Sequence, residues 1–320
     1  MLNLINSALE ITEDTFKREV IEGLRQTPKR IPSKFFYDVQ GSRLFEAIAC
    51  LDEYYLTRTE ISILRAHLPE LAALIGKDAL VIEFGTGAGV KTSMLLEALD
   101  RPRAYIPIDI SREALDHASR GLAKKFPSLN IQPLWMDYTD SLTLPTVRDG
   151  HGQHVIFFPG STIGNFEPEE AIAFLQRAAS LAGPRGSLLI GFDLVKDRSV
   201  LEAAYNDKLG VTAQFNLHLI ERIAEEFGAP ISPEDFEHLA FFNEHESRIE
   251  MHLVARTPLI LSLDGEEIYL GKGEHIVTEY SYKYTPDAFR KILSASGFEF
   301  ESRWTDAKEY FEVCYATVHK

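Results

Sequence analysis

Short apolar runs alternate with segments of helical periodicity through residues 79–192, and this rhythm most constrains the fold. Such an alternation is typical of a parallel β-sheet whose strands are joined by helices. The runs are almost continuously apolar, as expected of strands that are buried on both faces. The expected strands are residues 79–84, 104–109, 131–136, 154–159 and 186–192. The sequence therefore predicts an α/β fold with a parallel sheet in its middle.

The rhythm is lost on both sides of this region. Residues before about 60 are polar and helical with scattered aromatic residues, and a long helical stretch follows at 200–227. Apolar and polar residues then alternate at 247–256, 259–263 and 274–284. A helix at 286–296 and strands at 298–304 and 310–318 are expected to return to the edge of the sheet.

These changes predict two domains, each built from two stretches of the chain. We expect a core of residues 61–199 and 286–320, and a second domain of residues 8–60 and 200–285. Small-molecule sites form preferentially between domains, so a binding site is expected where these two meet.

Composition and charge exclude several classes of protein. Among 320 residues, 45% are hydrophobic and 25% are charged, which is enough apolar material for a large core. The net charge of −15 repels phosphate backbones and anionic lipid, so neither nucleic acid nor a membrane surface is an expected partner. No apolar run approaches the ~20 residues of a membrane span, and no secretory signal pattern opens the chain. We expect a cytoplasmic monomer.

Cysteines and histidines give no sign of a metal site. Cys50 and Cys314 are the two cysteines, too few for a disulfide framework or a four-thiolate metal site. The ten histidines are scattered without the paired spacing of metal ligands. No metal is therefore expected.

A glycine-rich loop at residues 83–89 lies between the first expected strand and its helix. Gly85, Gly87 and Gly89 let the backbone turn tightly and approach a ligand closely. Their spacing departs from the G-x-G-x-x-G fingerprint of dinucleotide-binding proteins. By itself such a loop serves packing as often as it serves a cofactor.

Acidic residues at the ends of the next two strands favour a cofactor. Asp109 ends the second strand, where a carboxylate can accept hydrogen bonds from two ribose hydroxyls. Asp137 follows the third strand, where it can accept from an adenine amino group while Tyr138 covers the ring. This set fits S-adenosylmethionine better than NAD, whose pyrophosphate would need the helix N-terminus.

Four clusters of polar and aromatic residues lie outside the loop, at 34–38, 51–60, 159–166 and 278–284. Taken singly, each has a plain structural explanation, because tyrosine clusters are usually core or interface and a strand glutamate usually faces solvent. In the last cluster Glu279 and Ser281 are two residues apart, so they point to one side of a strand.

At these clusters the chain resembles the L-histidine Nα-methyltransferases of ergothioneine biosynthesis, S-adenosylmethionine-dependent enzymes that make hercynine. Phe-Tyr-Asp at 36–38, Tyr-Tyr-x-Thr-Arg-Thr-Glu at 54–60 and Gly-Ser-Thr-Ile-Gly-Asn at 160–165 form a far more specific combination than the glycine loop. Other matching stretches are 41–45, 83–96, 193–197, 210–216, 248–251 and 278–283, spread over almost the whole chain. The loop departs slightly, with Gly-Thr-Gly-Ala where the family commonly has Gly-Ser-Gly-Thr.

The resemblance implies a Rossmann-like class I S-adenosylmethionine-dependent methyltransferase core. It also implies a substrate-binding domain built from the N-terminal segment and the insertion, and L-histidine as the small-molecule substrate. Trimethylation of the α-nitrogen is expected, because nothing in the chemistry stops after one transfer.

Site residues follow from the resemblance position by position. On the substrate side they are Tyr37 near the α-amino group as the catalytic residue, Asn165 and Tyr205 at the carboxylate, Phe45 and Tyr54 shaping the pocket, Glu279 and Ser281 at the imidazole, and Met251 packed beside it. On the cofactor side they are Gly85, Lys91, Asp109, Asp137 and Tyr138, with Gly160 beside the methyl donor.

Three other interpretations remain open at this point. A methyltransferase of another amino acid, such as tryptophan, or of a related amine would be expected to lack residues of the Glu279 and Met251 types. A nicotinamide oxidoreductase is disfavoured by the glycine spacing. A silent binding module is disfavoured because Tyr37, Asp109 and Asp137 are all present.

Overall fold

The computed structural model describes residues 5–6, 13–139, 143–147 and 152–319. The chain divides into two compact units, each assembled from separate stretches of sequence. The first unit comprises Met1–Glu10, Leu56–Val195 and Lys283–Lys320, and the second comprises Ile11–Tyr55 and Lys196–Tyr282.

The first unit is built on a sheet that has nine strands among the described residues. Its order is β1-β6-β4-β3-β7-β8-β15-β14, with β5 paired to β4. The strands are β1 (Ile5–Asn6), β3 (Leu80–Phe84), β4 (Ala104–Asp109), β5 (Asn130–Ile131), β6 (Leu134–Trp135), β7 (His154–Phe158), β8 (Ser187–Asp193), β14 (Phe298–Thr305) and β15 (Phe311–Val318).

Strand direction identifies the type of sheet. The central pairs β4–β3, β3–β7 and β7–β8 are parallel, whereas β15 is antiparallel to both β8 and β14. A parallel, doubly wound sheet with one reversed strand inserted next to its edge is the Rossmann-like core of class I methyltransferases. This confirms the predicted fold class, including the return of the two C-terminal strands to the sheet.

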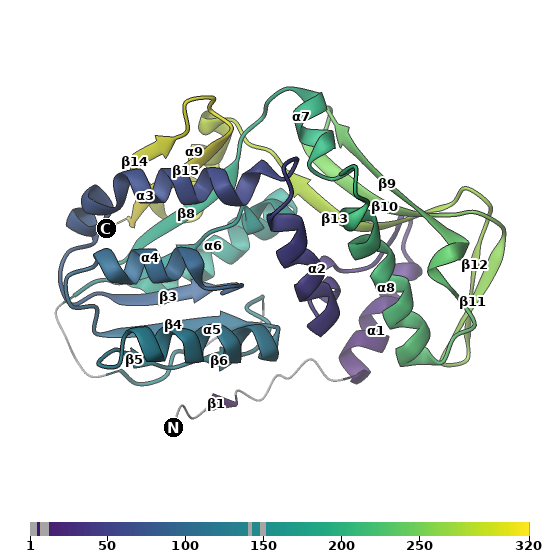
Figure 1. Cartoon of the computed structure of the whole chain (residues 1–320), viewed down its shortest axis with the longest axis horizontal. Coiled ribbons are helices and arrows are strands. Elements are labelled where there is room, and N and C mark those ends of the chain that lie inside the picture. Colours follow the sequence, from purple (N-terminus) through teal and green to yellow (C-terminus); the bar gives the residue numbers. More distant parts are fainter. Residues whose placement is uncertain (1–4, 7–12, 140–142, 148–151, 320) are drawn as a thin grey trace. The chain divides into compact units, whose positions relative to one another are not determined.

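Helices cover both faces of this sheet (Figure 1). On one face lie α3 (Tyr55–Ile75), α4 (Val90–Ala98) and α5 (Arg112–Lys125), and on the other lie α6 (Pro168–Ala182) and α9 (Pro286–Ala295). Because both faces are covered, every residue of β3, β4 and β8 is buried. The continuous apolar runs in the sequence have this cause.

The second unit contains a four-stranded sheet in the order β2-β13-β10-β9. Its strands are β2 (Lys29–Arg30), β9 (Phe236–Asn243), β10 (Arg248–Ala255) and β13 (His275–Tyr282), and β11 (Leu259–Leu263) and β12 (Glu266–Leu270) form a separate hairpin. Its helices are α1 (Glu13–Leu24), η1 (Ser33–Phe36), α2 (Val39–Ala49), α7 (Arg198–Ala203), α8 (Val211–Phe227) and η3 (Pro233–Asp235). Helix α8 packs on β9 and β10 and also contacts α2.

Two predicted elements differ from the structure, and one strand is absent from the prediction. The third strand, expected at 131–136, is two short strands, β5 and β6, because Pro133 has no N–H for a continuous ladder. The long helix expected at 200–227 is divided into α7 and α8, since Gly210 adopts a left-handed conformation with φ of 71°. The sequence does not predict β9 (Phe236–Asn243), because the polar His238 occupies one of its inward positions and interrupts the apolar alternation.

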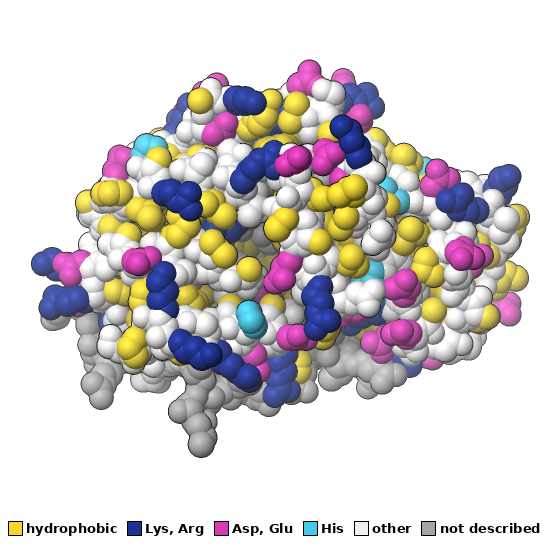
Figure 2. Space-filling view, viewed as in Figure 1, with side chains coloured by type: hydrophobic (Ala, Val, Ile, Leu, Met, Phe, Trp, Pro, Cys, Tyr) yellow, Lys and Arg dark blue, Asp and Glu magenta, His cyan; other side chains and the backbone are white. Residues whose placement is uncertain are grey.

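Two further features are the distribution of surface charge and the length and polarity of the helices. Acidic and basic side chains of the described residues are interspersed over the face shown in Figure 2. Among the residues that the structure describes, no helix is both long enough and apolar enough to cross a membrane.

Candidate active site

The glycine loop joins β3 to α4 at the carboxyl edge of the first unit's sheet. Gly85 and Gly87 adopt positive φ values of 74° and 51°, which other residues rarely tolerate. A Cβ atom built at either position would meet no heavy atom within 4 Å. The backbone of the loop is therefore open on this side, so a ligand can lie directly against it.

Asp109 is held beside this loop by three backbone amides. Its Oδ2 accepts hydrogen bonds from Thr86 N at 2.8 Å and Gly87 N at 3.4 Å, and its Oδ1 accepts from Ser111 N at 2.8 Å. Burial raises the pKa of Asp109, and the bonds from these amides oppose that rise. The carboxylate thus has a fixed orientation at the end of β4, where a ribose is expected.

Glu83, the acidic residue at the end of β3, has a structural role. Its carboxyl group accepts from Thr92 Oγ1 at 2.7 Å and from the Tyr105 hydroxyl, so it ties β3 to α4 and β4. Burial raises the pKa of Glu83 to about 8, although the Tyr105 and Thr92 hydrogen bonds work against this.

Asp137 and Tyr138 follow β6, which pairs with β4 in parallel. Asp137 Oδ1 accepts from Thr139 N at 2.8 Å and from Thr139 Oγ1 at 2.6 Å. The Tyr138 ring lies 5.7 Å from that of Phe84 at the end of β3. The acidic groups and the open glycine backbone therefore meet at one edge of the sheet. This set of acceptors fits the hydroxyls and amino groups of S-adenosylmethionine.

Glu60, on α3, joins two further predicted cofactor positions. It is almost completely buried, and its Oε1 and Oε2 lie 3.0 and 2.9 Å from Gly160 N, which donates to them. Lys91 Nζ, on the first turn of α4, donates to Oε2 at 2.6 Å. Sequence reasoning did not select Glu60, although it closes the motif at 54–60.

The loop after β7 is also tied to β8. Ser161 N donates to Gly191 O at 3.1 Å, and Asp193 N donates to Ser161 Oγ at 3.0 Å. Ser161 itself has a positive φ of 59°, which these bonds hold in place. Asn165 ends the short helix η2 (Thr162–Asn165) that follows, so its position depends on this anchored turn.

The aromatic residues predicted for the substrate site lie in the second unit, and their rings form one continuous row. The rings of Tyr37 and Phe45 are 5.6 Å apart, those of Phe45 and Tyr54 are 6.1 Å apart, and those of Tyr54 and Tyr205 are 6.3 Å apart. Phe215 on α8 contacts Tyr37 at 5.9 Å and Phe45 at 6.1 Å. Sequence reasoning did not single out Phe215, although it lies in the matching stretch at 210–216.

An ion pair fixes the backbone next to Tyr37. Asp38 caps the N-terminus of α2 through Gly41 N, and its carboxylate is 2.8 Å from His218 Nε2 on α8. The hydrogen bond to Asp38 raises the pKa of His218, against the effect of burial. The pKa of Asp38 is lowered, since bonds from His218 and Gly41 outweigh its desolvation. Tyr37 therefore precedes a charged, anchored helix cap.

Strand β13 presents the predicted imidazole-binding residues. Glu279 pairs across the sheet with Met251, and Ser281 pairs with Ile249, so both face the same side. Ser281 Oγ accepts from the Tyr205 hydroxyl at 2.8 Å. The structure thus links Tyr205 to the pair of residues predicted at the imidazole.

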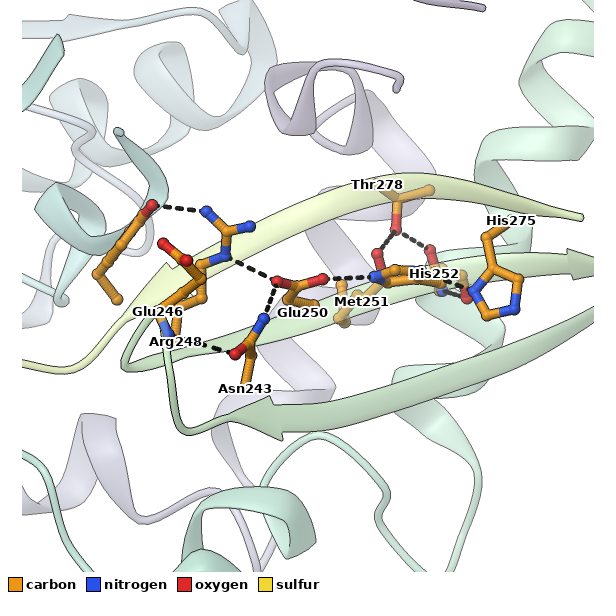
Figure 3. A network of polar contacts seen from close by, with 10 residues as sticks. Asn243, Glu246, Arg248, Glu250, Met251, His252, His275 and Thr278 are labelled. Carbon is orange, nitrogen blue, oxygen red and sulfur yellow. Dashed lines mark hydrogen bonds and ion pairs between the residues drawn. The ribbon is translucent and has the colours of Figure 1, made fainter. Parts of the chain in front are cut away.

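Polar side chains also lie on the opposite side of the same sheet (Figure 3). Glu250 accepts from Arg248 Nε at 2.8 Å and from Asn243 Nδ2 at 2.9 Å, and its Oε2 lies 3.0 Å from His252 Nε2. This network holds β9 and β10 together behind the side on which Glu279 lies.

Each unit therefore carries its own set of predicted residues. The first unit holds Asn165 and the cofactor set Gly85, Lys91, Asp109, Asp137, Tyr138 and Gly160. The second unit holds the rest of the substrate set, namely Tyr37, Phe45, Tyr54, Tyr205, Met251, Glu279 and Ser281.

Comparisons with known proteins agree with this chemistry. A family model described as "Histidine-specific methyltransferase, SAM-dependent" matches residues 16–318. The chain belongs to this family. S-adenosylmethionine is its cofactor, as predicted, and the enzyme is not a nicotinamide oxidoreductase.

Relatives of this methyltransferase include proteins named for histidine methylation or for ergothioneine biosynthesis. The chain is 39% identical over 306 residues to the histidine N-alpha-methyltransferase of Mycolicibacterium smegmatis, covering 93% of this chain and 94% of that protein. It is also 39% identical over 295 residues to the histidine N-alpha-methyltransferase of Mycobacterium tuberculosis, covering 91% of each. Ergothioneine biosynthesis protein 1 of Neurospora crassa is 33% identical over 293 residues, which are 88% of this chain and 32% of that protein.

Proposed function

We propose that this enzyme transfers methyl groups from S-adenosylmethionine to the α-nitrogen of L-histidine. Three successive transfers give hercynine, the first intermediate on the route to ergothioneine. The observation that carries the proposal is the arrangement on β13, where Glu279 and Ser281 share one side and Ser281 is bonded to Tyr205. A carboxylate and a hydroxyl on one side match the N–H and the acceptor nitrogen of an imidazole.

Substrate selection follows from the same residues. Glu279 accepts the imidazole N–H, Met251 packs beside the ring, and Tyr205 with Asn165 binds the carboxylate. A substrate with an apolar side chain would offer the Glu279 carboxylate no hydrogen bond in place of the one from the imidazole N–H, and losing that bond costs ~1–3 kcal/mol. Tryptophan or a related amine as substrate is the alternative, and the presence of Met251 beside Glu279 disfavours it.

Catalysis here is chiefly a matter of positioning. S-adenosylmethionine supplies an activated methyl group on a sulfonium. The protein must hold a neutral amine behind that methyl group, and the row of aromatic residues from Tyr37 to Tyr205 provides a defined place for it. The α-amine is mostly protonated at neutral pH, so before each transfer it loses a proton to solvent along a path lined by Tyr37. Tyrosine faces also attract the trimethylammonium product by cation–π interaction.

The cofactor lies in the first unit in this proposal. Asp109 binds the ribose, Asp137 and Tyr138 bind the adenine, and Gly85 provides the close backbone approach. Lys91 and Gly160 lie at the methionine end. The first unit is thus proposed as the cofactor domain and the second as the substrate domain.

The cellular setting is proposed on chemical grounds. Cys50 and Cys314 are both unpaired, as is usual for proteins of the reducing cytoplasm. We place the enzyme there, as a monomer whose partners are small molecules.

Substitution of Glu279 tests this proposal. We expect Glu279→Ala to raise the KM for histidine about tenfold or more, because the imidazole N–H loses its charged acceptor. The KM for S-adenosylmethionine should stay within about twofold, since that pocket is built by other residues. Glu237→Gln, an exposed glutamate of β9, is the matched control. An unchanged histidine KM in Glu279→Ala would remove Glu279 from the imidazole.

A further inference from the structure

An irregularity in the sheet decides which way Glu279 and Ser281 point. Between β10 and β13 the register changes, because Met251 pairs with Glu279 whereas His252 pairs with Val277. Thr278 is therefore a bulged residue without a partner across the ladder. If the register of His252 and Val277 simply continued, Glu279 would stand opposite the buried Glu250. The bulge turns Glu279 and Ser281 to the side of Met251 instead.

Asn216 of α8 holds the bulge from both strands. It is fully buried, and its Oδ1 accepts from Thr278 Oγ1 at 2.7 Å. Its Nδ2 donates to His252 O at 3.0 Å and lies 2.9 Å from His238 Nδ1. Figure 3 shows Thr278 and His252 on the neighbouring strands that this amide bridges. Every hydrogen-bonding group of the Asn216 amide is therefore used.

His238 of β9 carries the connection on to Tyr205. Its Nε2 is 3.0 Å from Tyr205 O, and because a carbonyl only accepts, Nε2 carries the proton. The ring is then neutral with Nδ1 as acceptor, which suits the donor Nδ2 of Asn216. Burial also lowers the pKa of His238 and favours the neutral ring. The Tyr205 hydroxyl in turn donates a hydrogen bond to Ser281 Oγ on β13.

Hydrogen bonds therefore connect Tyr205 through His238 and Asn216 to Thr278, and the β13 backbone leads from Thr278 to Ser281, which is bonded back to Tyr205. We infer that Asn216 and His238 are positioning residues for substrate recognition. They act through Thr278 and Tyr205, fixing the bulge and the Tyr205 backbone together so that Glu279, Ser281 and the Tyr205 hydroxyl keep one arrangement. The inference rests on the proposed function, since it assigns these residues to the site that selects the amino acid.

The bonding pattern predicts what each substitution does. Asn216→Asp keeps the shape of the side chain but cannot donate to His252 O or to neutral His238. The side chain then keeps its bond to Thr278 on β13 but loses its bond to β10. His238→Phe keeps a flat ring and removes both hydrogen bonds. His238→Gln restores an amide donor for Tyr205 O and serves as the conservative variant.

The test compares histidine KM with cofactor binding in these variants. We expect Asn216→Asp and His238→Phe to raise the histidine KM about tenfold, or about 1.4 kcal/mol, with His238→Gln in between. The Kd for S-adenosylhomocysteine, measured by calorimetry, should stay within about twofold, because the first unit is unchanged. The matched control is Asn243→Ala, which removes a hydrogen bond to Glu250 on the other side of the same sheet. It should leave the histidine KM unchanged.

Two results would overturn the inference. One is a histidine KM within about twofold of wild type in both His238 variants; the other is an equal rise in Asn243→Ala. If Asn216→Asp does not fold, the His238 pair decides alone. If the wild-type enzyme methylates a different amino acid, the proposed function fails, but the same KM comparison made with that amino acid still decides the inference.

Discussion

Glu60 offers a sharp test of the proposal that the first unit holds the cofactor. Its buried carboxylate joins the Lys91 ammonium, at 2.6 Å, to the backbone N–H of Gly160. Lys91 and Gly160 are both predicted cofactor positions. Because the Glu60 carboxylate is bonded to both, it fixes the distance between them. Glu60→Gln keeps an acceptor for Gly160 N but removes the charge that faces Lys91.

The structure sets the size of the expected effect. Breaking a fully buried ion pair costs ~3–5 kcal/mol, but the Lys91 side chain is 19% exposed, so water offsets part of this. A charge-assisted hydrogen bond lost at such a position costs about 1.5–3 kcal/mol. If this cost falls on the cofactor complex, S-adenosylhomocysteine should bind about 10–100-fold more weakly. Glu60→Ala should bind it still more weakly, because Gly160 N then also loses its acceptor.

Calorimetric titration with S-adenosylhomocysteine measures this directly, since that molecule cannot react. Thermal unfolding of the same samples, without ligand, reports the purely structural cost. Glu169→Gln, an exposed position on α6, is the control and should change neither. A variant that unfolds at lower temperature yet binds with the wild-type Kd would refute the reasoning, because Glu60 would then only stabilise the fold.

Three further predictions concern other parts of the site. Tyr37→Phe should lower kcat about tenfold through loss of its hydroxyl near the reacting amine, and a change in KM alone would contradict that placement. Gly87→Ala should weaken cofactor binding measured by calorimetry, since a φ of 51° costs a non-glycine residue ~1–2 kcal/mol and its methyl group enters the open side of the loop. His218→Gln should lower the unfolding free energy most near pH 6 and least above pH 8. The raised pKa of His218 makes its bond to Asp38 stabilising below its unfolded pKa of about 6.5, and this is lost as pH rises through the folded pKa. An equal loss at both pH values would contradict it.

The sheet of the first unit could be predicted because its strands are locally unambiguous. β3 and β4 are mostly apolar and end at the glycine loop and at Asp109, so the apolar pattern places both strands and the residues at their carboxyl ends. The bounds of β6 were harder to predict from the sequence, because Pro133 interrupts the apolar run and separates β6 from β5. The S-adenosylmethionine prediction rested on residues close in sequence to strand ends, which is where such patterns are readable.

The second unit was harder to predict, since its key contacts join distant residues. The bulge at Thr278 depends on Asn216, which lies 62 residues earlier, and no periodicity in β13 reveals it. His238 looked like one of many scattered histidines and proved to bridge Tyr205 and Asn216. Glu60 and Phe215 lay within recognised motifs, but only the folded chain shows their partners. Buried polar residues of this kind are specified by tertiary structure rather than local pattern.

Mass spectrometry of the purified protein, incubated with S-adenosylmethionine and a mixture of the twenty amino acids, shows whether this enzyme methylates the α-nitrogen of histidine. Histidine alone should gain mass, by three methylene units, with fragmentation placing all three on the α-nitrogen. Mass gained by another amino acid, or on the imidazole of histidine, would contradict the proposed function.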